Sequence, residues 1–467
     1  MPLDVEAHAL RAALMGDGNE PGVIQAVLGH TTGTTVIKGV HVMNDLAQLI
    51  VGGVPQHKGD LMARVIREDV GREEDHSDAA LRSTPGLGEV YARAVPLNLS
   101  PRERSRLRRA LGAVFNHDRG VYRPSTGMAS GLATHRALLG EEGFRRFQVG
   151  ALLFRLLGEP GRARLRALLT TADDPVSRLL TPLLYDAPLS PRAAPEAAEP
   201  PSPFDLAVGR RLTALLAHPL SKPALLRALL LGATLLITLR ALGVGCPDGR
   251  PTALATVTLD EGGAVPLRAA AAQSFKRGLI RLDERLARAL ATHPAVVRAW
   301  GRPAASGDER VPLGQELKSL DEAAPVMLRA ARTHRWVGER DVYWPEEFLA
   351  ALGRKAGCIQ PRTDRAGWGK RLALTGDLIE VLLLMYTEPD GPPVPWRTLW
   401  EQIAAELGLV IGVNAHRDAE LLDAAGVAHV SQDALEENGE AALELAVRRG
   451  LARRLPDSDA EAGGSLT

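Results

Sequence analysis

The stretch ALLLGATLLITL (residues 228–239) is the most apolar segment of the chain, and Arg227 and Arg240 bracket it. A helix needs about 20 predominantly apolar residues to cross a bilayer, and this uncharged run is shorter. It therefore predicts a helix that is buried in the protein core rather than one that spans a membrane. We expect no membrane partner.

The composition of the chain limits its class. Its 467 residues are 45% hydrophobic and 24% charged, which is enough for two to four domains at roughly 100–200 residues each. Lys+Arg and Asp+Glu both total 56, so the formal net charge is zero. No global field draws the protein to nucleic acid or to acidic lipid, and such binding would need a local patch.

The cysteines and the N-terminus indicate the compartment. The two cysteines, Cys246 and Cys358, have no CxxC neighbour, which excludes a disulfide framework and a cysteine-rich zinc module. Asp4 and Glu6 stand where a secretory signal would be positively charged. Arginine, alanine and leucine dominate, as is typical of GC-rich genomes. We expect a cytoplasmic bacterial protein without a cofactor.

Helical periodicity recurs along the chain and predicts a mainly α protein. Residues 100–115 begin with Ser100 as N-cap, Pro101 in the first turn and Glu103 completing a capping box. In residues 269–291, apolar side chains recur at steps of three and four, as on the buried stripe of an amphipathic helix.

A proline-rich segment divides the chain. Residues 186–203 contain six prolines, which disfavour both helix and sheet, so we interpret them as a stiff linker. A softer boundary precedes Pro345, which begins a new helix. The expected organisation is an N-terminal helical domain (1–186), the linker (187–203), a middle helical domain (204–344), a C-terminal winged-helix-like domain (345–456) and a disordered tail (457–467).

The C-terminal domain has the most specific element order. An apolar helix that contains Leu378, an amphipathic helix from Trp396 and a third helix capped by Ser431 precede a basic, strand-like end. This order matches a winged-helix or helix-turn-helix module. The third helix is acidic and would repel phosphates, so we expect this module to contact a partner protein.

Three sequences in this domain resemble the C-terminal region of uncharacterised proteins encoded beside bacterial anti-phage defence genes: FLAALGRKAGCIQPR (348–362), GKRLALTGDLIEVLL (369–383) and RRGLARRLPDSD (448–459). The resemblance covers about a quarter of the chain, and none of its motifs is chemically diagnostic. It implies an accessory component of a multi-gene DNA-defence complex. It carries over no catalytic residue.

The stretch LGHTTGTTVIKG (28–39) has the glycines of a phosphate loop but not their spacing. Gly29 and Gly33 are one residue too close for a Walker motif, and Thr34 replaces its lysine. Its flanks are a helix that ends at Gly29 and a strand-like TTVIKGVHV (34–42), the reverse of strand–loop–helix. We predict a helix C-cap and a turn.

Two arginine-rich regions are the candidate nucleic-acid contacts, because clustered cations attract phosphates without regard to sequence. One is a connector with Arg362, Arg365, Lys370 and Arg371, and the other is a helix face with Arg102, Arg106 and Arg109. The alternative for the second group is pairing with acids elsewhere in a neutral protein.

The expected function is a non-catalytic accessory component of a bacterial DNA-transaction or anti-phage defence complex. Its partners would be proteins, with DNA as a further candidate and no small-molecule ligand. The alternative is an enzyme with a metal- or phosphate-dependent site in the N-terminal region. The residues of such a site would be His30, His41, His57, His76, Asp45, Asp60 and Asp75. No metal-ligand spacing such as H-E-x-x-H connects them.

Overall fold

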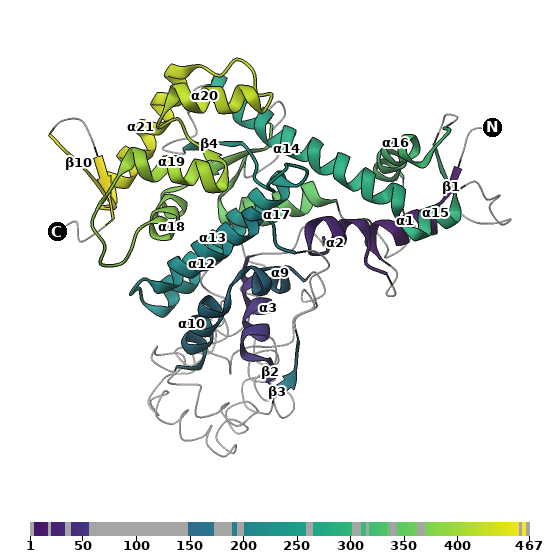
Figure 1. The fold of residues 1–467 in the computed structure, drawn as a ribbon, viewed down its shortest axis with the longest axis horizontal. Helices are drawn as coiled ribbons and strands as arrows, with labels where there is room; N and C mark the ends of the chain where they lie inside the picture. The colour runs from purple at the N-terminus through teal and green to yellow at the C-terminus, as the bar shows by residue number, and fades with distance from the viewer. Residues whose placement is uncertain are drawn as a thin grey trace, which may run out of the picture.

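The computed structural model describes residues 4–16, 20–32, 39–55, 148–171, 189–193, 200–257, 265–300, 310–313, 317–334, 336, 342, 344–361, 369–456 and 460–463. Helices dominate these residues and a few small sheets accompany them, which confirms the mainly α prediction (Figure 1). The predicted helix at 100–115 lies outside the described residues.

Helix α13 (Lys222–Gly243) is the central element of the core. It is 22 residues long and apolar enough to cross a membrane, but 89% of its most apolar window is buried inside the protein. Helices α12 (Pro203–Ala217), α14 (Val265–Thr292), α17 (Pro345–Ala356) and α18 (Gly376–Tyr386) pack around it (Figure 1). The prediction of a buried core helix from residues 228–239 is confirmed.

Helix α14 extends the core along the molecule. Its buried side chains include Phe275, Leu282, Leu286 and Leu290, which share one side of the helix as the periodicity predicts. The part of α14 from Ile280 to Ala291 packs against α16 (Leu320–Thr333). A long helix with one apolar stripe is thereby covered along that stripe and open to solvent elsewhere.

A small, buried mixed sheet lies against α14. Its strand order is β6 (Ile359–Gln360), β7 (Arg371–Leu374), β4 (Ala253–Val257) and β9 (Leu409–Val410). Strands β7 and β9 run parallel to β4 on its two sides, and β6 is antiparallel to β7. Every residue of β4 is buried, as expected for a parallel strand with both faces covered.

The C-terminal elements form a second sheet between helices. In chain order after α18 they are β8 (Val394–Pro395), α19 (Trp396–Leu407), β9, α20 (Ala415–Ala424), α21 (Gln432–Arg448), β10 (Ala452–Arg454) and β11 (Ala460–Ala462). Strand β11 lies between β10 and β8, and both pairings are antiparallel. Part of the segment expected as a tail is therefore strand β11. Ser431 caps α21 as predicted, and its side chain accepts a hydrogen bond from Ala434 N.

The N-terminal elements are mostly short helices. They are α1 (Ala7–Met15), α2 (Val23–Leu28), α3 (Gly39–Val51), α9 (Val149–Leu156) and α10 (Glu159–Thr170). Strand β1 (Asp4–Glu6) pairs with β5 (Arg310–Pro312), next to α15 (Pro294–Ala299), and β2 (Gly53–Pro55) pairs with β3 (Leu189–Pro191) from the proline-rich segment.

The predicted joint at Gly29 is confirmed as a helix C-cap, because Gly29 has φ 74° and ends α2. The strand-like interpretation of residues 34–42 is wrong from Gly39 onward, where α3 begins. Nearly every side chain of α3 is buried, mainly against α9 and α10. This burial overrides the local β preference of valine.

One hydrophobic cluster contains residues from Val5 to Ala462, so the N-terminal, middle and C-terminal helices share buried surface. A smaller cluster lies under α20 and α21 and includes Leu254 and Leu422.

Candidate functional site

Of the predicted basic connector, the structure describes Lys370 and Arg371, which lie at the start of β7. The chain passes directly over α14 there, because a Cβ added to Gly369 would lie 2.8 Å from Ala272 Cβ. Lys370 is half-buried, whereas Arg371 is buried with 7% of its surface exposed. Lys370 is thus the described connector residue with access to solvent.

Arg371 lies near a second guanidinium group, that of Arg268. Burial lowers the pKa of Arg371, and the positive charge of Arg268 on α14 lowers it further. The contact between β7 and α14 therefore brings two arginines close together.

Lys276 extends this positive region along α14. It is exposed and lies one helical turn beyond Ala272, on the side of α14 that the connector crosses. Among the described residues it has no ion-pair partner. We call Arg268, Lys276, Lys370 and Arg371 the basic face. The sequence did not single out Arg268 and Lys276, because only the contact between β7 and α14 brings them beside the connector.

The remaining predicted contacts, Arg362, Arg365, Arg102, Arg106 and Arg109, lie outside the described residues and stay predictions.

The arginines at the end of α21 and in β10 have a different environment, because acids neutralise them. Arg449 lies 2.7 Å from Asp377 and 3.4 Å from Glu380. The other pairs are Arg448 with Glu444, Arg453 with Glu461 and Arg454 with Glu440. This arginine cluster (448–454) therefore presents little net positive charge.

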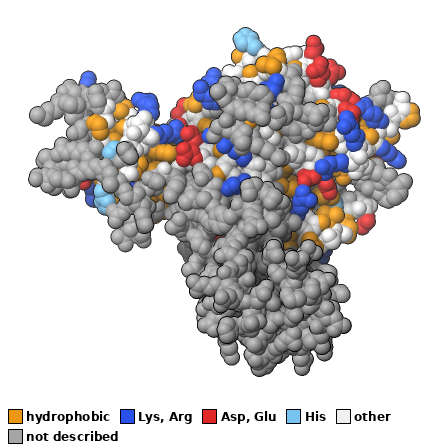
Figure 2. Space-filling model, turned by 180° about the vertical axis from the view of Figure 1, so that it is seen from behind, with side chains coloured by type: hydrophobic (Ala, Val, Ile, Leu, Met, Phe, Trp, Pro, Cys, Tyr) orange, Lys and Arg blue, Asp and Glu red, His pale blue; other side chains and the backbone are white. Residues whose placement is uncertain are grey.

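The outward side of α21 is negative, as its sequence predicts. Glu436, Glu437, Glu440 and Glu444 are exposed, while Leu435, Asn438 and Ala442 face inward. On the face of the molecule seen in Figure 2, blue and red side chains are interspersed over the described part. Two of these glutamates, Glu440 and Glu444, pair with Arg454 and Arg448, so Glu436 and Glu437 contribute most of the negative charge of this side.

Asn438 anchors the inward side of α21 to the mixed sheet. Its Oδ1 accepts a hydrogen bond from Val257 N at 2.8 Å, and its Nδ2 donates to Ala255 O at 3.0 Å and Ile411 O at 2.8 Å. These backbone groups belong to β4 and the end of β9, where ligands commonly bind in open α/β sheets. Here a side chain of the protein occupies that position.

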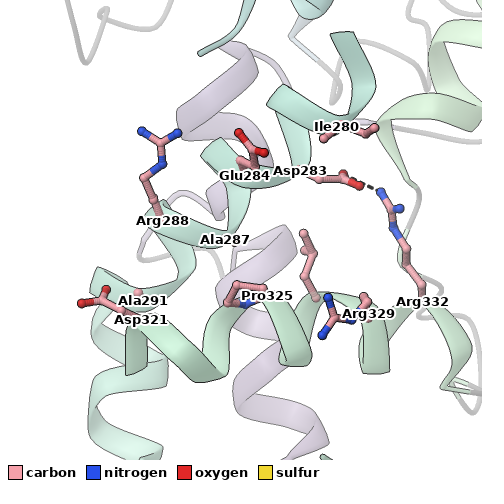
Figure 3. Close-up of a pocket in the computed structure, with 11 residues that line it drawn as sticks. Ile280, Asp283, Glu284, Ala287, Arg288, Ala291, Asp321, Pro325, Arg329 and Arg332 are labelled. Carbon is pink, nitrogen blue, oxygen red and sulfur yellow. Dashed lines mark hydrogen bonds and ion pairs between the residues drawn. The ribbon is translucent and has the colours of Figure 1, made fainter. Parts of the chain in front are cut away.

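A groove with a volume of about 640 Å³ opens between α14 and α16 (Figure 3). The ion pair between Asp283 and Arg332, at 2.7 Å, lies at one end of it. Arg332 also stacks over the Trp344 ring, 4.9 Å from its centroid, and lies 3.6 Å from Glu346. Burial raises the pKa of Asp283, and Arg332 opposes that shift.

The N-terminal histidines and aspartates that the structure describes serve the core. His30 is buried beside the Phe348 ring, and its Nδ1–H donates to Thr31 O at 2.9 Å. Asp45 pairs with Arg192 and accepts a hydrogen bond from Gly150 N at 2.8 Å. Within the described ranges, no three His, Cys, Asp or Glu side chains group as metal ligands. His57, Asp60, Asp75 and His76 lie outside those ranges.

The surroundings of Cys358 make its thiol a poor nucleophile. Burial raises the pKa of Cys358 to about 12, so that thiol stays protonated near neutral pH. Cys246 is half-buried, and Arg281 Nη1 lies 3.7 Å from its Sγ.

No known protein family, curated protein or solved structure matches this chain. Function must therefore be inferred from its own residues.

Proposed function

We propose that this protein is a non-catalytic accessory component of a bacterial DNA-transaction or anti-phage defence assembly. Its C-terminal module binds a partner protein, and its basic face, with the connector, binds DNA. The observation that carries the proposal is the contrast between the arginine cluster (448–454), whose arginines are paired with acids, and the two lysines of the basic face, Lys276 and Lys370, which have access to solvent.

The element order supports a winged-helix-like C-terminal module. A winged helix runs helix, strand, helix, helix and then a two-stranded wing. Here α18, β8, α19, α21, β10 and β11 follow that order, and β11 lies between β10 and β8. Strand β9 and helix α20 are then an insertion between the second and third helices, and α20 packs on α21.

The charges of this module favour a protein partner over DNA. Its third helix, α21, exposes Glu436 and Glu437, and the arginines at its end are paired with acids, whereas a recognition helix would need cations or neutral donors. The arginines of the wing are paired with Glu461 and Glu440, so phosphate would have to compete with carboxylate for them. Protein interfaces tolerate such mixed-sign surfaces when the partner is complementary.

The basic face supports DNA contact of the backbone type. Cations from α14 and β7 lie together although they are far apart in sequence, and Lys276 and Lys370 have access to solvent. Lysines attract phosphates without base readout. We therefore expect binding that weakens with salt and discriminates little between sequences.

The test of DNA contact is fluorescence anisotropy with labelled duplex and single-stranded DNA across a salt series. The full chain is compared with a connector variant, Arg362→Ala, Arg365→Ala and Lys370→Ala. Arg371 is left intact because it is buried. The matched control removes three arginines from the neutralised cluster: Arg448→Ala, Arg453→Ala and Arg454→Ala.

Salt-sensitive binding that the connector variant loses and the control keeps would support DNA contact at the connector. Absence of binding at low salt, or equal loss in both variants, would overturn that part of the proposal. Partner binding is tested separately by in-cell cross-linking of the full chain and of a Glu436→Lys, Glu437→Lys variant. A cross-linked partner that the variant retains would contradict the role of α21.

A further inference from the structure

The groove between α14 and α16 has an apolar floor. Ala287 and Ala291 are small residues on α14, and Leu328 of α16 lies between the two helices. Ile280 is 40% exposed and is one of four large aliphatic side chains that are exposed among the described residues. From Ile280 to Ala291 the groove follows about 17 Å of α14, at 1.5 Å per residue.

A proline inside α16 lines the same groove. Pro325 lacks the N–H that would bond to the carbonyl of Asp321, and an interior proline costs a helix about 3 kcal/mol. The carbonyl of Asp321 therefore lacks its usual helical donor, and Asp321 and Pro325 both line the groove.

The rims of the groove carry opposite charges in a fixed order (Figure 3). Moving away from the Asp283–Arg332 ion pair, the α14 rim carries Glu284 and then Arg288. Over the same direction the antiparallel α16 rim carries Arg329 and then Asp321. Among the described residues, none of these four exposed side chains has an ion-pair partner.

We propose that this groove is a docking site for an amphipathic helix of a partner protein. The helix would complete a three-helix arrangement with α14 and α16 and place apolar side chains on Ile280 and Leu328. Moving away from the Asp283–Arg332 ion pair, the partner helix would carry a cation and then an anion on its flank along α14. On its flank along α16 it would carry an anion and then a cation. This charge order matches the rims, as charges beside the apolar seam of a coiled coil match each other.

The charge balance of this groove favours a ligand of mixed charge over a phosphate-rich one. Its lining contains three acids, Asp283, Glu284 and Asp321, and three arginines, Arg288, Arg329 and Arg332, so the formal sum is zero. Arg332 is already held by Asp283. A nucleic acid would meet as many carboxylates as cations, whereas a helix with mixed charges can satisfy both.

The probe is a fluorescein-labelled synthetic helical peptide of about 15 residues, roughly 22 Å long, with a leucine stripe. One flank carries lysine then glutamate, and the other glutamate then lysine. This pattern is unchanged when the peptide is reversed end to end, so both binding directions are complementary. The control peptide has the same composition with the order on each flank exchanged. Binding to the full chain is measured by fluorescence anisotropy.

The complementary peptide should bind about 10-fold more tightly than the control peptide, because the control places like charges together. Arg288→Glu with Arg329→Glu should weaken the complementary peptide by about the same factor. Ile280→Asp should weaken both peptides. All three residues are exposed, and circular dichroism checks that each variant is folded.

Equal binding of the two peptides, or none by either at about 100 μM, would overturn the proposal. So would a dimer of the full chain, seen by light scattering, that Ile280→Asp converts to a monomer. That outcome would assign the groove to a second copy of this chain. The DNA-binding experiment does not involve the groove, so the two proposals fail independently.

Discussion

The arginine cluster (448–454) and the basic face are both rich in cations, yet their surroundings differ. In the cluster, each arginine lies against a carboxylate of α18, α21 or β11. In the basic face, Lys276 is exposed without an ion-pair partner among the described residues, and Lys370 has access to solvent. Local density of arginine in a sequence therefore does not measure positive potential; the acids brought near by folding do.

Asn438 joins α21 to β4, the strand that leads into α14, and its substitution should destabilise the protein strongly. Asn438→Ala leaves three buried backbone groups without their partner. The free energy of unfolding should fall by about 3 kcal/mol, as measured by urea denaturation. The control is Asn414→Ala, which removes a helix cap from α20 and should cost only about 1 kcal/mol. Equal losses in the two variants would contradict an anchoring role for Asn438.

A third group of arginines binds backbone carbonyls and contributes to the pH dependence of stability. Arg240 and Arg155 donate to Leu28 O at 2.6 Å and Gly29 O at 2.8 Å, and so cap the carboxyl end of α2 beside His30. Burial lowers the pKa of His30 from 6.5 to about 4, and both arginines lower it further. These arginines stabilise the backbone rather than face solvent.

In the unfolded state His30 takes up a proton near pH 6.5, whereas in the folded state it does so only near pH 4. The free energy of unfolding should therefore fall as pH falls from 6.5 to 4. The lowered pKa of His30 corresponds to a loss of about 3 kcal/mol in the free energy of unfolding over this pH range. In a His30→Phe variant, the slope of unfolding free energy against pH should flatten across that window. An unchanged slope, measured by denaturation at several pH values, would show that other groups dominate it.

The next effect is smaller and concerns Lys276, which only the fold places in the basic face. Lys276→Gln should reduce the slope of log affinity against log salt for duplex DNA by about 1 and weaken binding at low salt. Arg397→Gln is the matched control, since Arg397 is exposed and pairs with Glu401. A slope that changes equally in both variants would remove Lys276 from the interface.

Removing acids beside the arginine cluster (448–454) should have only a small effect. Glu440→Gln with Glu461→Gln removes the acids that neutralise Arg454 and Arg453. Since exposed pairs contribute about 0–1 kcal/mol each, stability should hardly change. DNA binding should nevertheless become a few-fold tighter at low salt, because the positive charges of Arg453 and Arg454 would no longer be neutralised. Unchanged affinity would show that paired acids are not what keeps this cluster from DNA.

Much of the helical architecture could be predicted from local pattern. The buried helix around residues 228–239, the stripe that contains Phe275, the Gly29 C-cap and the Ser431 N-cap are all present. Each depends on periodicity or on a cap within a few residues. The exception was α3, where burial of almost the whole helix made local β preference uninformative.

The candidate sites were less predictable, since they assemble across long separations. Arg268 and Arg371 are about a hundred residues apart in sequence, and Glu440 meets Arg454 only because α21 turns back into β10. The groove needs the contact between α14 and α16, and no periodicity in either helix specifies its partner.

Local sequence indicates which segments become helices, which of their sides are buried and where several of them end, because those properties follow from neighbours within one or two turns. The packing of distant segments, in contrast, sets which cations are neutralised, places Asn438 at the end of the sheet and borders the groove with mixed charges. Those features depend on electrostatic and packing contacts between distant segments, which no local pattern contains.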